Sequence, residues 1–255
     1  MTDARAGARS DAGKVRANNE DRWLIRDQRG VLLLAVADGV GGEASGEHAS
    51  AAAVDTLADR FYAALGGQDL RSALGAAIRD ANDAVVRAAG ARGDRSATTL
   101  VVAAVHGREV TVANIGDSRA YLIRKATVRQ ITTDHSGANA HEITRFVGDE
   151  RGIQPDLFVE TLSPGDRLVL CSDGLTRHVP DGEIGLHARR LEPGRAASEL
   201  VDLANSRGGE DNVTVVVYEA RGSALLRAFA ATAILLVLVM VTLIGAALAI
   251  LPAAP

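Results

Sequence analysis

Four aspartates stand in four separate short runs of this 255-residue chain, in settings that suit a metal site. Three of the runs adjoin an apolar stretch typical of a strand, and three of the aspartates have a glycine beside them. Carboxylates that project from strand ends can meet in a shared cleft, where oxygen ligands favour Mg²⁺ or Mn²⁺ and leave room for a phosphate. The four aspartates are Asp38, Asp117, Asp173 and Asp211.

An arginine that could bind a phosphate precedes these runs. Arg16 stands four residues before the acidic pair Glu20 and Asp21, so a bidentate phosphate donor could lie beside two further carboxylates. Each feature alone has an ordinary explanation, because an Asp-Gly pair is usually a turn and the acidic pair could simply form salt bridges with Arg16. Their combination favours a centre that handles phosphate.

Seven short motifs follow one another between about residues 10 and 219. They are Arg-x-x-x-Glu-Asp, Asp-Gly-Val-Gly-Gly, Ala-Thr-Thr-Leu, Gly-Asp-Ser-Arg, Asp-His-Ser, Ser-Asp-Gly-Leu and Glu-Asp-Asn-Val-Thr. Any one of them is weak, but the ordered series resembles the metal-dependent serine/threonine protein phosphatases of the PPM family, the type 2C enzymes, in their bacterial form.

The resemblance implies a centre of two Mn²⁺ or Mg²⁺ ions. By position, Asp38 would bridge both ions. The backbone carbonyl of Gly39 and the carboxylate of Glu20 would serve one ion, and Asp173 and Asp211 would serve the other. Asp38 is therefore the first predicted catalytic residue.

Three further residues would surround the ions if the resemblance holds. Asp21 would hold metal-bound water, Asp117 would help to bind a third, weaker ion, and Arg16 would bind the substrate phosphate as the second catalytic residue. Two cations about 3.5 to 4 Å apart can share a water and lower its pKa, so that hydroxide attacks phosphorus in line. The expected reaction is hydrolysis of phosphoserine and phosphothreonine in proteins.

The chain departs from the family pattern at two places. Val40 stands where some relatives have a histidine proposed as the general acid, so the sequence names no proton donor for the leaving group. After the run Asp134 to Ser136, the flap that borders the cleft in many bacterial relatives looks shortened. The substrate preference of the relatives and the geometry of their third ion therefore cannot be assumed for this chain.

Two alternatives deserve comparison with the metal hydrolase. Cys171 and Arg177 have the Cys-x5-Arg spacing of cysteine-dependent tyrosine phosphatases, but Asp173 would put a like charge inside that loop, and a thiol that ends an apolar strand is ordinarily inert. The other alternative is a catalytically silent phosphoprotein-binding module of the same fold. Loss of a core aspartate would favour that module, and all of them are present.

Composition narrows the class of protein further. The net charge is −4, the pI is near 5.9 and aromatic residues make up 3% of the chain, so the sequence shows neither a basic groove nor a stacking platform for nucleic acid. A single cysteine excludes an internal disulfide framework and fits a reducing compartment. The hydrophobic fraction of 47% is sufficient for a core.

The C-terminal part differs sharply from the rest. Residues 228–251 contain no charged side chain, and a helix of this length spans roughly 36 Å, enough to cross a bilayer core of about 30 Å. Arg221 and Arg227 precede this segment and no charge follows it, which predicts a cytoplasmic catalytic domain. We expect a single-pass protein of the cell inner or plasma membrane that acts on phosphorylated proteins, with membrane-associated kinases and their substrates as candidates.

The pattern of apolar residues predicts an α+β fold. Strands, two helices, an antiparallel meander over 98–131, further helices and a last strand follow in order, with mixed loop and helix over 132–154. Helices are expected at 45–65, 70–89, 182–190 and 196–206, and strands outside the meander at 23–26, 31–37, 157–162, 167–171 and 212–218. The family resemblance implies a four-layer α-β-β-α sandwich of two mainly antiparallel sheets flanked by helices.

The expected division of the chain has five parts. They are a flexible N-terminus at 1–10, a phosphatase domain at 11–220, a juxtamembrane linker at 221–227, a transmembrane helix at 228–251 and a short tail at 252–255. The sequence leaves the oligomeric state open.

Overall fold

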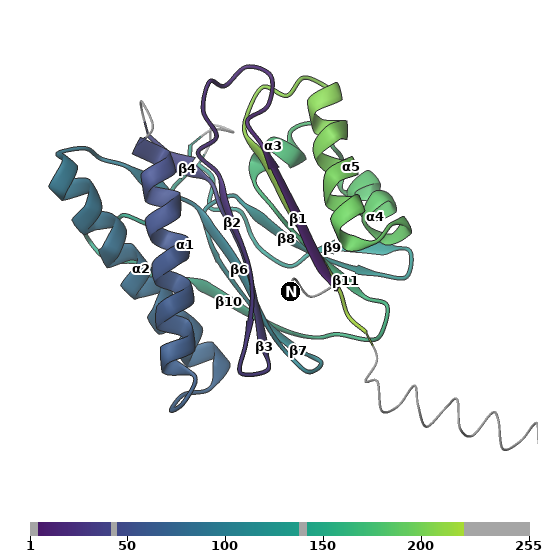
Figure 1. The fold of residues 1–255 in the computed structure, drawn as a ribbon, viewed down its shortest axis with the longest axis horizontal. Helices are drawn as coiled ribbons and strands as arrows, with labels where there is room; N and C mark the ends of the chain where they lie inside the picture. The colour runs from purple at the N-terminus through teal and green to yellow at the C-terminus, as the bar shows by residue number, and fades with distance from the viewer. Residues whose placement is uncertain (1–4, 42–44, 138–141, 222–255) are drawn as a thin grey trace, which may run out of the picture. The chain divides into compact units, whose positions relative to one another are not determined.

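The computed structural model describes residues 5–41, 45–137 and 142–221. Within these ranges, ten strands form two five-stranded antiparallel sheets (Figure 1). One sheet has the order β1 (Ala6–Asp11), β12 (Val213–Glu219), β11 (Arg167–Cys171), β8 (Arg119–Arg124) and β9 (Thr127–Gln130). The other has the order β10 (Asp156–Thr161), β7 (Glu109–Ile115), β6 (Leu100–His106), β3 (Val31–Ala37) and β2 (Arg22–Gln28). The short strands β4 (Gly39–Val40) and β5 (Ala97–Thr98) pair separately.

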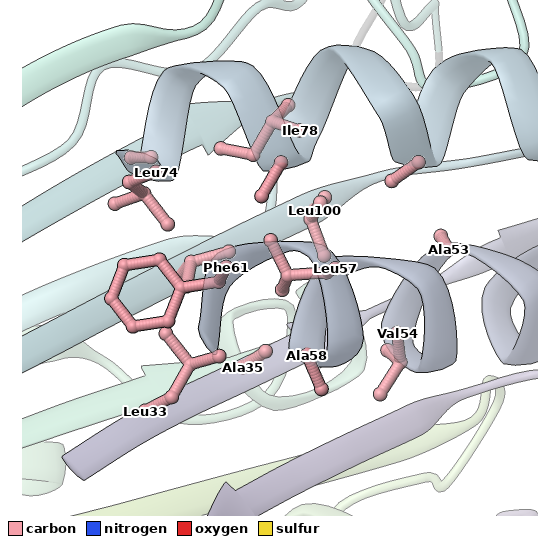
Figure 2. Packing of buried hydrophobic residues seen from close by; sticks show 14 of the residues in the cluster. Leu33, Ala35, Ala53, Val54, Leu57, Ala58, Phe61, Leu74, Ile78 and Leu100 are labelled. Carbon is pink, nitrogen blue, oxygen red and sulfur yellow. The ribbon is translucent and has the colours of Figure 1, made fainter. Parts of the chain in front are cut away.

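Helices cover the outer faces of both sheets (Figure 1). The helices are α1 (Ser45–Ala64), α2 (Leu70–Arg92), α3 (Asp173–Thr176), α4 (Asp181–Arg190) and α5 (Pro193–Ser206). The long pair α1 and α2 packs on the sheet that contains β3, and Figure 2 shows Phe61 of α1 between Leu33 of β3 and Leu74 of α2. Helices α4 and α5 pack on the sheet that contains β11 and β12.

Strand β3 explains how the layers stack. Every residue of β3 is buried, and successive side chains point to opposite faces of a strand. Leu33 belongs to the apolar cluster beneath α1 and α2, whereas Leu34 belongs to the cluster between the two sheets, with Leu170 and Val216. The described residues thus form the helix, sheet, sheet, helix arrangement that the sequence analysis predicted.

Most predicted elements are confirmed to within a few residues, but the flexible N-terminus is wrong over its second half. Residues 6–11 form β1, which pairs antiparallel with β12, so that Ala6 lies opposite Tyr218. The segment looked mobile because it is short of large apolar residues. Small residues are needed there, since a Cβ on Gly7 would lie 2.3 Å from the Cα of Gly194 in α5.

The stretch after β9 was predicted to be part loop and part helix, and its described residues contain no helix. Instead, isolated bridges pair Ser136 with Ile143 and Thr98 with Val147. The predicted shortened flap falls in this stretch, and residues 138–141 lie outside the described residues.

The predicted transmembrane helix at 228–251 and tail at 252–255 lie outside the described residues, as do positions 222–227 of the predicted linker. In the ranges that the structure does describe, no helix has the length and apolar character to span a membrane. The compact unit that carries both sheets ends at Ala220.

Candidate functional site

Asp38 follows β3, and two threonines of the neighbouring segment fix its backbone. The Asp38 N–H donates to Thr99 Oγ1 at 3.0 Å, and the Asp38 carbonyl accepts from the Thr99 N–H and the Thr98 hydroxyl, both at 2.9 Å. Sequence analysis alone gives these threonines no role in the site. The position of Gly39 is equally constrained, because a Cβ there would lie 2.3 Å from the carbonyl oxygen of Gly46.

Asp117 lies in the turn between β7 and β8, next to the same threonine. Ser118 Oγ and Thr99 Oγ1 are 2.7 Å apart, so one hydroxyl connects the segments that carry Asp38 and Asp117. Asp117 is 8% exposed, and among the described residues its Oδ1 has no hydrogen-bond partner. Burial, and then the charge of Asp173, raises the pKa of Asp117 to about 6.

Asp173 begins α3 after strand β11, and Asp211 lies two residues before β12. Gly174 allows the two segments to approach, because a Cβ on it would lie 2.0 Å from the carbonyl oxygen of Asn212. The backbone N–H of Asn212 donates to Asp211 Oδ1 at 2.9 Å, which orients that carboxylate. The Asn212 side chain accepts the N–H of Glu20 at 2.8 Å, and so connects the segment before β12 to the loop that carries Arg16.

Asp21 is almost completely buried, and it contacts Ser172, the residue before Asp173. Ser172 Oγ donates to Asp21 Oδ2 at 2.7 Å, while Asp21 Oδ1 has no partner among the described residues. Burial is the main cause that raises the pKa of Asp21 to about 7, and the charges of Asp173 and Asp211 add to it. Asp21 is therefore a buried acid with one oxygen available.

Asp38 completes an acidic cluster, which we define as Asp21, Asp38, Asp117, Asp173 and Asp211. Burial, followed by the charges of the other four members, raises the pKa of Asp38 well above its usual range. Aspartates that are far apart in the sequence thus lie within electrostatic reach of one another, as the sequence analysis predicted.

Glu20 has a different environment from the aspartates. Burial raises the pKa of Glu20, and a backbone hydrogen bond from Gly46 at the start of α1 offsets only part of this rise. The carbonyl oxygen of Glu20 lies against Gly39, where an added Cβ would come within 2.7 Å. Glu20 and Gly39, which are both expected to bind the same ion, therefore have their backbones in contact.

Two arginines hold carboxylates of the acidic cluster. Arg16 binds Asp211 in bidentate fashion, with its Nε 3.0 Å from Oδ1 and its Nη2 3.0 Å from Oδ2. Arg177 donates from Nε to Asp173 Oδ2 at 3.0 Å, and its Nη2 bonds to the same oxygen. The sequence analysis gave Arg177 no role beyond the cysteine-phosphatase spacing, although its separation of four residues from Asp173 on a helix is a usable signal.

The acidic cluster fits a hard divalent cation in donor type and charge. All its members offer carboxylate oxygens, and the unpartnered Oδ1 atoms of Asp21 and Asp117 are buried acceptors that a cation or its water could satisfy. Across the described ranges, however, no three Asp, Glu, His or Cys side chains lie close enough to enclose an ion as they stand. The guanidinium groups of Arg16 and Arg177 occupy oxygens of Asp211 and Asp173.

Cys171 cannot serve as a nucleophile in this environment. Its side chain is completely buried, and burial raises the pKa of its thiol to about 12. His135 is also occupied, because its Nδ1 accepts the N–H of Gly116 at 3.0 Å and its Nε2 lies 3.1 Å from Asp156 Oδ2.

Comparison with known proteins adds independent findings. Residues 12–210 match the family model described as protein phosphatase 2C. The chain is 35% identical over 241 residues to a serine/threonine phosphatase, stp, of Listeria innocua, covering 83% of this chain and 94% of that protein. It is 39% identical over 235 residues to the serine/threonine protein phosphatase PstP of Mycobacterium tuberculosis, covering 84% of this chain and 44% of that longer protein.

Solved structures of similar proteins have the same fold. The crystal structure of the Mycobacterium tuberculosis phosphatase PstP/Ppp superimposes with a TM-score of 0.78 at 36% identity, covering 86% of this chain and 99% of that one. The catalytic domain of PstP in complex with two manganese ions gives a TM-score of 0.76 at 38% identity, covering 84% of this chain and 97% of that one.

Proposed function

The chain belongs to the protein phosphatase 2C family, and from this premise we propose that it hydrolyses phosphoserine and phosphothreonine in proteins with the help of two Mn²⁺ or Mg²⁺ ions. The observation that carries the proposal is the acidic cluster beside the guanidinium group of Arg16, in which burial and the charges of neighbouring carboxylates raise the pKa of Asp21, Asp38 and Asp117. A cluster of buried acids that lacks cations is costly, and divalent ions would relieve it.

The residues divide between holding ions and holding substrate. Asp38, Asp173 and Asp211, with Glu20 and the Gly39 carbonyl, would hold the two ions. When bound, such ions supply positive charge for the phosphate and lower the pKa of a water so that it can act as the nucleophile. Asp38 has the central role because the charges of the other four aspartates all reach it.

Arg16, Asp21 and Asp117 would act around the ions. Arg16 is half-exposed and, once released from Asp211, can donate two parallel hydrogen bonds to phosphate oxygens. Asp21 can accept a hydrogen bond from water at its unpartnered Oδ1. We assign Asp117 to a third, weaker ion because its own unpartnered oxygen is buried near the charge of Asp173.

The test is release of phosphate from a phosphothreonine peptide, with and without Mn²⁺ and a chelator. We expect turnover that needs the metal and that Asp38→Asn reduces by about a hundredfold or more, a typical cost of losing one strong electrostatic contact in a reaction centre. Asp59→Asn, at an exposed position on α1, is the matched control. Turnover that survives chelation, or full activity of Asp38→Asn, would contradict the proposal.

The same experiment separates the enzyme from a catalytically silent binding module. A silent module would bind the phosphothreonine peptide without releasing phosphate at any metal concentration. The presence of all five aspartates favours turnover.

We further propose that residues 228–251 anchor the protein in the inner or plasma membrane with the phosphatase domain in the cytoplasm. The support is the absence of charge over this segment and the arginines Arg221 and Arg227 before it. The proposed substrates are phosphorylated proteins near that membrane, with membrane-associated kinases among them, because anchoring raises their effective concentration. Deleting residues 225–255 should release the protein from membrane fractions and slow dephosphorylation of membrane proteins in cells. An unchanged distribution would refute the anchor.

A further inference from the structure

Arg177 places a second guanidinium group among the carboxylates of the acidic cluster. Besides its two bonds to Asp173, its Nη1 lies 3.5 Å from Asp211 Oδ2. Its side chain is 32% exposed, so solvent can reach the group. Burial lowers the pKa of Arg177, but the charges of Asp173, Asp211 and Asp38 outweigh this effect and raise it. The guanidinium is therefore a permanent positive charge at the site.

Arg16 and Arg177 converge on one carboxylate oxygen. Asp211 Oδ2 accepts from Arg16 Nη2 at 3.0 Å and also lies 3.5 Å from Arg177 Nη1. A phosphate offers guanidinium groups the same paired oxygen acceptors as a carboxylate does, with a larger charge. Both arginines contact this one oxygen of Asp211. A phosphate oxygen in the same position would therefore also be well placed to accept from both guanidinium groups.

A stabilising role for α3 accounts for only part of these contacts. Arg177 and Asp173 are four residues apart, a spacing at which ion pairs support a helix. The contact with Asp211 crosses to the segment before β12, however, and helix α3 has only four residues. The Arg177 side chain thus contacts Asp211 across the site as well as Asp173 in the adjoining helix.

Building on the proposed function, we infer that Arg177 is a second phosphate-binding residue, which exchanges the Asp173 carboxylate for the substrate phosphate when the acidic cluster binds its metal ions. While Arg177 holds Asp173, it occupies an oxygen that an ion needs. When a phosphate draws Arg177 away, that oxygen becomes available. Metal binding and phosphate binding therefore strengthen each other, and by the same factor in both directions.

The experiment titrates Mn²⁺ into metal-free protein by calorimetry, with and without inorganic phosphate, for the wild type, Arg177→Gln and Arg177→Lys. The KM for a phosphothreonine peptide is measured in parallel. Arg129→Gln is the control, because Arg129 is a half-exposed arginine on β9 that pairs with Glu160 and contacts none of the acidic cluster. Thermal melts confirm that each variant is folded.

Opposite effects on the two ligands are expected from Arg177→Gln. Without phosphate, Mn²⁺ should bind about tenfold more tightly, because a competing positive charge has been removed. Phosphate should tighten Mn²⁺ binding less than in the wild type, because only Arg16 is left to exchange a carboxylate for it, and the KM for the peptide should rise by about tenfold, as expected for loss of a charged hydrogen bond. Arg177→Lys keeps the charge without the planar fork, so it should restore weak Mn²⁺ binding but leave the KM raised.

Two results would overturn the inference. Arg177→Gln could leave the KM and the effect of phosphate on Mn²⁺ affinity as in the wild type, in which case Arg177 only stabilises α3. It could also tighten Mn²⁺ binding with an unchanged KM, in which case Arg177 only competes with the metal. Because the calorimetric coupling needs no turnover, failure of the wild type to hydrolyse the peptide would count against the proposed function and leave the test of Arg177 intact.

Discussion

At the scale of single residues, the buried acids make the stability of the metal-free protein depend on pH. The pKa of Asp117 is raised from 3.8 to about 6, so the folded state binds this proton more tightly than the unfolded chain does. Between these two pH values the folded state holds more protons than the unfolded state. The contribution of Asp117 to the free energy of unfolding therefore falls as pH rises through this window. Above the folded pKa the whole of this loss of stability is present.

Asp117→Asn removes this penalty. We expect the free energy of unfolding of the metal-free protein to rise by about 1 to 3 kcal/mol at pH 7, which is what a shift of roughly two pKa units implies. The gain should disappear below the pKa of the unfolded chain. Urea unfolding in the presence of chelator at several pH values measures it, with Asp59→Asn as control. A gain of equal size at all pH values would contradict the electrostatic explanation.

Cys171 yields a second prediction at this scale. Because burial raises the pKa of its thiol to about 12, the folded protein should not react with a thiol reagent at pH 8, and unfolding should expose one reactive thiol. Cys171→Ala should change kcat/KM by less than about fivefold, because a buried thiol behaves as a small apolar side chain. A loss of activity as large as that expected for Asp38→Asn would revive the cysteine-based alternative.

At the scale of elements, the approach of α3 to the segment before β12 sets the position of Asp173 relative to Asp211. A Cβ on Gly174 would lie 2.0 Å from the carbonyl oxygen of Asn212, so Gly174→Ala must push the two segments apart. We expect a loss of about 1 to 3 kcal/mol in the free energy of unfolding, typical of overpacking, together with weaker Mn²⁺ binding.

Gly182→Ala is the matched control for Gly174→Ala. An added Cβ at Gly182, in α4, meets no atom within 4 Å, and alanine favours a helix over glycine by up to about 1 kcal/mol. This variant should be as stable as the wild type or more so, with unchanged Mn²⁺ binding. Equal destabilisation in both variants would show that the close approach at Gly174 is not what matters.

The elements also show what the sequence can and cannot predict. Helices α1 and α2 were predicted because their apolar spacing is local, and the acidic cluster was predicted because its motifs occur in order. Strand β1 was missed because its hydrogen-bonding partner, β12, lies at the other end of the domain. The roles of Thr99 and Arg177 were missed for the same reason, since each depends on contacts that only the folded chain creates.

At the scale of the whole molecule, the unit that ends at Ala220 contains both sheets, all described helices and the acidic cluster. A chain truncated after Arg221 should therefore keep the melting temperature and the metal-dependent kinetics of the domain in the full-length protein. Thermal melts and peptide hydrolysis of both forms in detergent provide the comparison. A truncated chain that fails to fold would mean that the segment after Arg221 contributes to the stability of the domain.

The position of β12 between β1 and β11 has a consequence for biosynthesis. Ser10 Oγ and Thr214 Oγ1 are 2.6 Å apart although 204 positions separate them, so β1 has no edge to join until β12 has left the ribosome. During translation β1 therefore stays unpaired while nearly the whole domain is made. Its free backbone groups can bind chaperones or pair with the wrong strand in that time. Closure of this sheet, which also brings Asp211 to the other aspartates, is then one of the last steps by which the newly made chain becomes active.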